Sequence, residues 1–345
     1  MRILRSLSIY SISHALVDAT CAAVAFYLLK INAVGQGQLV IFFILYNFLA
    51  FGLQTPLGLI VDKLRIPREF AIVGCLLVAL SVMAVKISPW LAIYLAGIGN
   101  AVFHVGGGVV ALNFDPKKAS LPGIFVAPGA LGLLAGTLMG KSFFTPWPLV
   151  FLLGVAAISI YFADIPEIID VQKYPKKISN FELIIFLIFL SVVARSVIGF
   201  ILVFPWKQNF DLLLILTLAV FLGKALGGII ADRLGWMRIA ISSLFISALL
   251  LPFGTIYPIC GFAGIFLFNM TMPITLVAIS NLIPGRAGLA FGLTTMALLF
   301  GYLLTFFNPG NIYVSRYFVL IATLLLMSVL FFGLRLYSRV TKNLI

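Results

Sequence analysis

The sequence is poor in charge and in the side chains that most enzymes use for catalysis. Its 345 residues include only 10 acidic residues, 3 cysteines and 2 histidines, and charged residues make up 10% of the chain. Soluble domains typically contain about 25% charged residues, so water is excluded as the main solvent. The cysteines, Cys21, Cys75 and Cys260, lack metal-site spacing and are interpreted as small packing residues. No nucleophile–base set or phosphate loop is recognisable, which argues against an enzyme.

Most of the chain consists of long apolar segments. Hydrophobic residues make up 63% of the chain, and a helix that spans a bilayer needs about 20 mostly apolar residues. Six runs in each half are predicted to be transmembrane helices: 7–29, 38–61, 69–86, 89–112, 119–140, 147–164, 181–204, 210–231, 237–255, 257–280, 285–307 and 313–337. The first run follows basic residues as in a signal peptide, but His14 and Asp18 interrupt it, so we expect it to be retained.

The excess of basic residues follows the predicted membrane topology. The formal net charge is +13, and with a cytoplasmic N-terminus most Lys and Arg residues fall on inner segments and few on outer loops. The positive-inside rule therefore predicts that both termini lie in the cytoplasm. We expect an integral, multi-pass protein of the plasma membrane. This topology accounts for the positive charge without nucleic acid or another acidic partner.

Two short sequences recur at an interval of about half the chain. One pair is Gly58-Leu59-Ile60-Val61-Asp62-Lys63-Leu64 and Gly228-Ile229-Ile230-Ala231-Asp232-Arg233-Leu234; the other is Lys118-Ala119-Ser120-Leu121 and Arg286-Ala287-Gly288-Leu289. Such repetition predicts a duplicated unit. A segment rich in charge and proline separates the halves, so the predicted domains are 1–164 and 181–345, joined by a cytoplasmic linker at 165–180.

Two six-helix halves with G-x-x-x-D-[KR] at the ends of the second and eighth runs resemble the major facilitator superfamily of secondary transporters. The resemblance implies an all-α membrane protein with 12 transmembrane helices in two pseudo-symmetric six-helix bundles. It also implies alternating access to one binding site. The helices in contact with this site would be those of runs 7–29, 89–112, 181–204 and 210–231. Three sequences are similar to the fosmidomycin-resistance-like efflux branch: His14-Ala15-Leu16-Val17-Asp18, Leu53-Gln54-Thr55-Pro56 and Val102-Phe103-His104.

Ionisable residues inside predicted spans are costly and are functional candidates. Asp18 is the only carboxylate deep in a span, and counting along the runs places His14 level with His104 and Asp18 level with Asn100. The functional interpretation is that Asp18 takes up and releases a proton, while His14 tunes Asp18 or relays the proton. The alternative is a His–Asp hydrogen bond that only holds the first helix against a neighbour.

Other polar residues in the spans are candidates for substrate binding: Asn100, His104, Arg195, Lys224, Gln54 and Asn269. Arg195 and Lys224 outnumber Asp18, so the site would be net positive and would attract an anionic compound. Alternatives remain for each type of residue. Arg195 could pair with Asp18, Lys224 could extend toward the cytoplasm, and the amides could join helices.

The repeated motifs have a mechanical interpretation. A helix N-terminus attracts a carboxylate, so Asp62 is predicted to bind the start of run 285–307 and Asp232 the start of run 119–140. Each contact would act as a latch. The predicted gating residues are Gly58, Asp62, Lys63, Arg68, Gly228, Asp232, Arg233 and Arg238. The alternative is that the Asp–Lys and Asp–Arg pairs only cap helices and fix the topology.

The sequence therefore predicts a secondary active transporter that exports a small compound, with anionic compounds favoured, in exchange for protons. We expect it to work as a monomer in the lipid bilayer, with the proton gradient as its energy source and no cofactor. One alternative is a divalent-metal transporter with His14, Asp18 and His104 as ligands, although Arg195 and Lys224 would repel a cation. The other is a membrane scaffold or enzyme that transports nothing.

Overall fold

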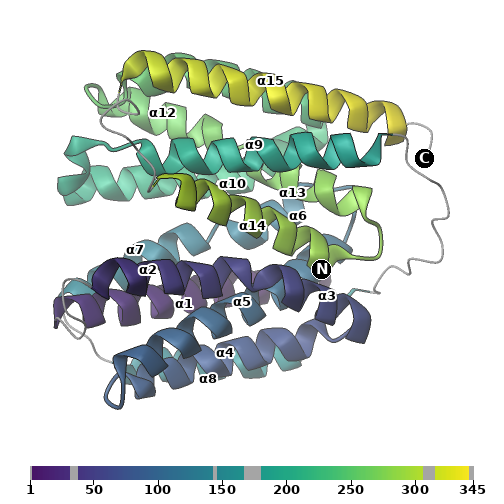
Figure 1. The fold of residues 1–345 in the computed structure, drawn as a ribbon. Coiled ribbons are helices and arrows are strands. Elements are labelled where there is room, and N and C mark those ends of the chain that lie inside the picture. Colours follow the sequence, from purple (N-terminus) through teal and green to yellow (C-terminus); the bar gives the residue numbers. More distant parts are fainter. Residues whose placement is uncertain (1, 32–37, 143–145, 167–179, 306–314, 342–345) are drawn as a thin grey trace. The chain divides into compact units, whose positions relative to one another are not determined.

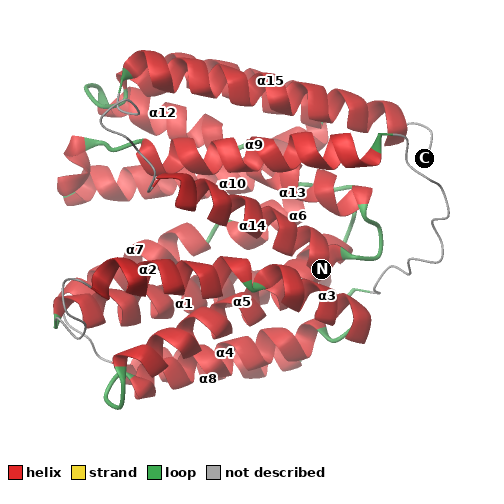
Figure 2. Ribbon diagram, viewed as in Figure 1, coloured by secondary structure: helices red, strands yellow, loops and turns green. Residues whose placement is uncertain are grey.

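The described part of the chain consists of helices and short connections, with no strand (Figure 2). The computed structural model describes residues 2–31, 38–142, 146–166, 180–305 and 315–341. Residues 167–179 of the predicted linker lie outside this part. The helices of the first half are α1 (Arg2–Lys30), α2 (Leu39–Asn47), the π-helix η2 (Phe48–Gly52), α3 (Gln54–Leu64), α4 (Pro67–Ala84), α5 (Pro89–Asn113), α6 (Ser120–Val126), α7 (Gly129–Ser142) and α8 (Pro146–Tyr161).

The second half repeats this pattern of long helices (Figure 1). Its elements are α9 (Phe181–Ile201), the 3₁₀-helix η4 (Pro205–Gln208), α10 (Phe210–Leu234), α11 (Trp236–Leu250), the 3₁₀-helix η5 (Leu251–Phe253), α12 (Pro258–Asn269), α13 (Thr271–Leu282), α14 (Ala287–Leu304) and α15 (Arg316–Thr341). Each predicted run coincides with one of these helices or with a consecutive set of them. The run ends at 306–307 and 313–314 lie outside the described residues.

Eleven spans within the described residues are long and apolar enough to cross a membrane, and the apolar helix Trp147–Tyr161 is shorter. These are the twelve runs that the sequence predicts. The chain is an integral, multi-pass membrane protein with an all-α fold.

Three of the spans are interrupted, although the sequence predicted continuous helices there. The interruptions fall at η2, between α6 and α7, and between α12 and α13. Pro128 lies within the second interruption, and Pro56 and Pro273 lie in the first turn of the helix after the other two. Proline has no N–H to donate to the carbonyl four residues earlier, so the helical hydrogen bond to that carbonyl is lost. Each interrupted span therefore releases backbone carbonyls from the helical pattern.

The chain divides into two compact units. Unit 1 contains residues Met1–Asp115, Phe125–Ile169 and Gly285–Thr295, and unit 2 contains Pro116–Ile124, Asp170–Pro284 and Met296–Ile345. Each unit thus includes a short segment from the other half of the sequence. These two segments hold the starts of α14 and α6, where the repeated motifs predicted contacts.

Small residues let α1 and α7 pack with their backbones close together in unit 1. A Cβ atom added at Gly140 would lie 2.6 Å from the Ala23 carbonyl oxygen, and added Cβ atoms at Gly132 and Gly136 would overlap the carbonyls of Ala15 and Ala19. Close backbone approach through small residues is a common way to pack helices in membranes. It fixes the position of α1, which carries His14 and Asp18.

We predict that Gly136→Val destabilises the protein by about 1–3 kcal/mol, because the added side chain must push α7 away from α1. The melting temperature of purified protein in detergent measures the effect. Gly154→Val in α8 is the matched control, since an added Cβ there has no atom within 4 Å. Equal melting temperatures for the two variants would contradict the close packing.

Candidate functional site

Two helices of unit 1 bring four of the predicted site residues together. His14 and Asp18 lie on α1, and Asn100 and His104 lie on α5. The Nε2 atoms of His14 and His104 are 2.9 Å apart, and Asn100 Nδ2 donates to Asp18 Oδ1 at 3.1 Å. Asp18 Oδ2 lies 3.1 Å from His14 Nε2, and Asp18 Oδ1 lies 3.6 Å from His104 Nε2. Counting depths along the sequence had predicted the same two pairs.

Backbone carbonyls fix the hydrogens of both imidazole rings. Nδ1 of His14 lies 2.8 Å from the Phe125 oxygen, and Nδ1 of His104 lies 2.8 Å from the Asn100 oxygen. A carbonyl oxygen can only accept a hydrogen bond, so each Nδ1 carries a hydrogen. In a neutral ring the other nitrogen, Nε2, then has a lone pair and no hydrogen.

The contact between the two Nε2 atoms therefore requires one more positive charge. At 2.9 Å two lone pairs would face each other and repel. A proton bound to one Nε2 and donated to the other removes this repulsion, and so does a cation bound by both lone pairs. The nearby Asp18 carboxylate stabilises either arrangement by its negative charge.

Apolar residues enclose the cluster on the side of the histidines. The rings of Phe103 and Phe125 are fully buried, and their centroids lie 6.3 Å and 4.8 Å from that of His14. The side chain of His14 is 5% exposed, that of His104 12% and that of Asp18 21%. Asp18 is thus the ionisable member of the cluster with the most access to solvent.

The interruption between α6 and α7 supplies two parts of this site. The Phe125 carbonyl, in the last turn of α6 where the helix is interrupted, accepts the hydrogen bond from His14. Gly129 packs directly on the cluster: an added Cβ would lie 2.5 Å from Asp18 Oδ2 and 2.6 Å from His14 Nε2. Neither Phe125 nor Gly129 was predicted from the sequence to be part of the site. The signal that could have found them is the proline and glycine in the middle of an apolar run.

In unit 2, Arg195 occupies the buried face of α9. Its side chain is in the core, with a relative exposure of 7%, and neither Nε nor Nη2 has a hydrogen-bond partner. Neighbouring hydroxyls are already engaged, since Ser191 donates to Ile188 and Ser196 donates to Leu298. Arg195 is therefore a buried cation with two hydrogen-bond donors, Nε and Nη2, that have no partner.

The remaining predicted binding residues lie in different surroundings. Gln54 is fully buried in unit 1, where its Nε2 donates to the Ala50 carbonyl across η2 and its Oε1 has no partner. Lys224 on α10 is half-buried in unit 2. Asn269 ends α12 and donates to its own helix at Ile265, close to Gly223 of α10. The structure thus brings together His14, Asp18, Asn100 and His104, while the side-chain amide of Gln54 bonds to Ala50.

Both motif carboxylates bind the start of a helix from the other half of the sequence. In unit 1, the two oxygens of Asp62 each accept a backbone N–H at 2.8 Å, one from Gly288 and one from Leu289. In unit 2, Asp232 accepts from Ala119 at 2.8 Å and from Ser120 at 2.9 Å. These are the two helix starts that the repeat predicted as partners. Their role as latches stays a prediction.

Close glycine packing accompanies each of these contacts. Added Cβ atoms at Gly58 and Gly228 would overlap the carbonyls of Gly288 and Ala119, respectively. Small residues here allow α3 to lie against α14 and α10 against the start of α6. The repeated Gly-x-x-x-Asp spacing therefore places a small residue and a carboxylate one helical turn apart on the same contact face.

The basic gating candidates take no part in the two carboxylate contacts. Lys63, Arg233 and Arg238 are exposed, and Arg68 donates from Nη2 to the Ala163 carbonyl at 2.7 Å. Asp232 instead receives a bond from the Trp236 indole at 3.0 Å.

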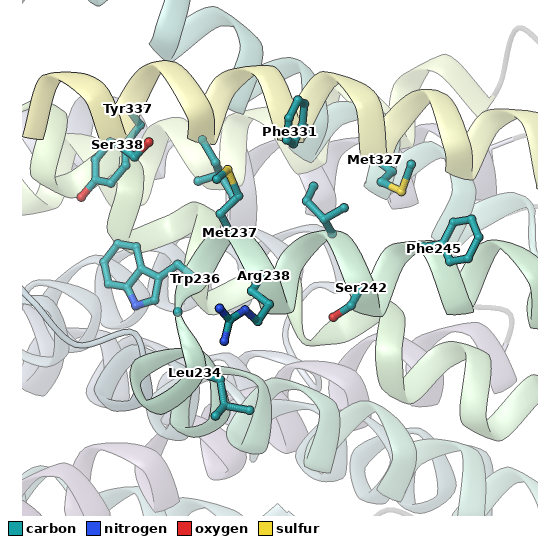
Figure 3. A pocket seen from close by; sticks show the side chains of 13 residues that line it. Leu234, Trp236, Met237, Arg238, Ser242, Phe245, Met327, Phe331, Tyr337 and Ser338 are labelled. Atoms are coloured by element: carbon teal, nitrogen blue, oxygen red, sulfur yellow. The ribbon is translucent and has the colours of Figure 1, made fainter.

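Arg238 lines a groove of about 830 Å³ on α11 and α15 (Figure 3). The side chains that line this groove are mostly apolar, including Met237, Phe245, Met327 and Phe331. A polar compound would find few hydrogen-bond partners there, and Arg238 is the one predicted site residue among those that line it.

We predict that Asp62→Ala exposes the backbone amides of Gly288 and Leu289 to exchange. The substitution removes two charge-assisted hydrogen bonds, each worth about 1.5–3 kcal/mol. Hydrogen–deuterium exchange should show faster exchange at 287–290 and unchanged exchange at 119–121. Asp232→Ala is the matched control and should give the reverse pattern. Exchange that does not change at either segment would contradict the two contacts.

Comparisons with known proteins place this arrangement in a known fold. No family model matches the sequence, and no curated protein matches it. A variant of the E. coli fucose:proton symporter FucP is similar in structure, with a TM-score of 0.73 and 11% identity over 98% of this chain and 99% of that one. FucP in an outward conformation gives a TM-score of 0.68 and 13% identity over 95% and 99% of the two chains.

The human organic anion transporter MFSD10 (TETRAN) is also similar in structure. Its TM-score is 0.72, with 14% identity over 98% of this chain and 100% of that one. The chain therefore has the fold of major facilitator superfamily transporters, as the sequence predicted.

Proposed function

We propose that this chain is a member of the major facilitator superfamily, acting as a secondary active transporter and not as an enzyme. The proposed reaction is the export of a small anionic compound in exchange for protons. The observation that carries the proton coupling is the paired Nε2 atoms of His14 and His104, 2.9 Å apart beside the Asp18 carboxylate.

The geometry of the cluster suits reversible proton binding. Because both Nδ1 atoms are held by backbone carbonyls, each ring can gain or lose a proton only at Nε2. Asp18 has the most exposed side chain of the three, so it is the group that exchanges protons with water. The proton then passes from Asp18 Oδ2 to His14 Nε2, which lies 3.1 Å away.

Other parts of the proposal rest on different residues. Arg195 supports an anionic compound because it is a buried cation with unused donors. Two of the structural neighbours are a proton symporter and an organic anion transporter, which supports protons and an anion as the transported species. The distribution of basic residues supports cytoplasmic termini, and the resemblance to an efflux branch supports export; a monomer in the plasma membrane is part of the same proposal.

The two carboxylate contacts are proposed to act as latches. Each joins residues from both halves of the sequence through two backbone hydrogen bonds to one aspartate. Alternating access requires contacts that form in one state and break in another. Asp62 and Asp232 fit this role because water can replace their partners when the helix starts move away.

Transport in proteoliposomes tests the proposal. An imposed pH gradient should drive accumulation of at least one compound from a panel of labelled carboxylates and phosphonates, and a protonophore should abolish it. Movement of the compound opposite to the proton would support export by exchange. If no compound moves in response to either direction of the gradient, the proposal of proton-coupled transport is wrong.

A divalent-metal transporter is a second candidate, favoured by the same histidines. Ligand atoms of His14, Asp18 and His104 all lie within 4.8 Å of one another. Metal-binding histidines commonly donate their other ring N–H to a backbone carbonyl, as both histidines do here. Cobalt(II) added to purified protein should then give a tetrahedral absorption spectrum that His14→Ala abolishes. Absence of binding at micromolar cobalt or zinc would remove this candidate.

A further inference from the structure

Arg195 has one complete edge of its guanidinium group unused. The atoms without a partner are Nε and Nη2, and the side chain is more than nine-tenths buried. These two nitrogens lie on the same side of the planar group, so their N–H bonds point in parallel. This is the fork that binds two oxygens of one anion at the same time.

No described acid of unit 2 is available to fill this fork. Glu182 is exposed at the start of α9, and Asp211 is exposed at the start of α10. Asp232 accepts hydrogen bonds from Ala119, Ser120 and Trp236. A buried charge without a partner is costly and marks a functional position in a membrane protein.

The surroundings of Arg195 favour a monoanion. Val192 and Ile198, three residues before and after it on the same face of α9, are apolar and fully buried. One guanidinium carries one positive charge, so a dianionic group would bring a negative charge that this position does not compensate. A carboxylate has two oxygens in one plane and a single charge, which matches both the fork and the charge.

We propose that Arg195 anchors the carboxylate of a monocarboxylate compound through side-on hydrogen bonds from Nε and Nη2. This assignment rests on the proposed function, which it deepens by naming the chemical class of the transported compound. Lysine cannot replace arginine at such a site, because its ammonium group lacks the planar pair of donors.

The test is nuclear magnetic resonance of the protein labelled with ¹⁵N-arginine in detergent, titrated with acetate. The Arg195 Nε–H signal, identified by its loss in Arg195→Lys, should shift and reach saturation with acetate. Acetamide, which is neutral and similar in shape, should cause no shift. Arg339→Lys, which removes an exposed arginine of α15, is the matched control and should leave the shifting signal in place.

Three results would overturn the assignment. The signal could stay unchanged up to the highest acetate concentration, it could shift equally with acetamide, or it could respond at lower concentrations of dianionic methylphosphonate than of acetate. If Arg195→Lys does not fold, Arg195→Gln identifies the signal instead. Because the titration uses no pH gradient, acetate binding without any gradient-driven transport would overturn the proposed function and leave this site standing.

Discussion

The Asp18→Asn protein is expected to lose transport driven by a pH gradient while it still folds. Asparagine has nearly the same shape as aspartate and can still accept the hydrogen bond from Asn100 through its Oδ1. It cannot bind or release a proton, and it removes the negative charge that lies 3.1 Å from His14 Nε2. Proton exchange between water and the buried histidines would therefore stop.

The measurement compares two modes of transport in proteoliposomes with the compound that the panel identifies. Accumulation driven by the pH gradient should fall to the level of protein-free liposomes. Exchange of labelled for unlabelled compound, which needs no net proton movement, should persist. Glu69→Gln, which removes an exposed carboxylate at the start of α4, is the control and should behave as the unaltered protein. Gradient-driven accumulation that survives Asp18→Asn would show that Asp18 is not the coupling group.

Most of the fold could be predicted from the apolar runs because a bilayer dictates their length. The boundaries agree closely, as in the run 89–112 and helix α5, which spans Pro89–Asn113. The interruptions after Gly52, Val126 and Asn269 were not predicted, although a proline stands near each. Proline in a membrane helix produces anything from a mild kink to a complete break, and the packing of neighbouring helices decides which.

The side chains of the site were easier to predict than its backbone. His14 and Asp18, like Asn100 and His104, are four residues apart, so each pair shares a helix face, and their depths could be counted. The carbonyl of Phe125 and the packing of Gly129 could not be found in this way, because they depend on where α7 lies against α1. The free edge of Arg195 was hidden for the same reason, since a sequence shows a buried charge but not its partners.

The role of the second histidine can be separated from its hydrogen bond by His104→Gln. A glutamine amide can donate to His14 Nε2 as a protonated imidazole does, so the contact is kept without a bound proton. We expect a melting temperature within a few degrees of the unaltered protein. His104→Ala, in contrast, removes one of the groups that contact the buried His14 Nε2, leaving Asp18 Oδ2 at 3.1 Å, and should lower stability by about 1–3 kcal/mol.

Transport by His104→Gln then shows whether the shared proton moves with the compound. If it does, the number of protons moved per molecule should fall by one, because Asp18 and His14 remain but the second ring does not. The measurement, in proteoliposomes, finds the gradient of the compound that just balances a known proton gradient, so that net flux stops. The ratio of these two gradients, each expressed as a free energy, gives the number of protons moved per molecule. An unchanged ratio would mean that the proton between the two rings only holds α1 against α5, and that Asp18 and His14 account for all of the coupling.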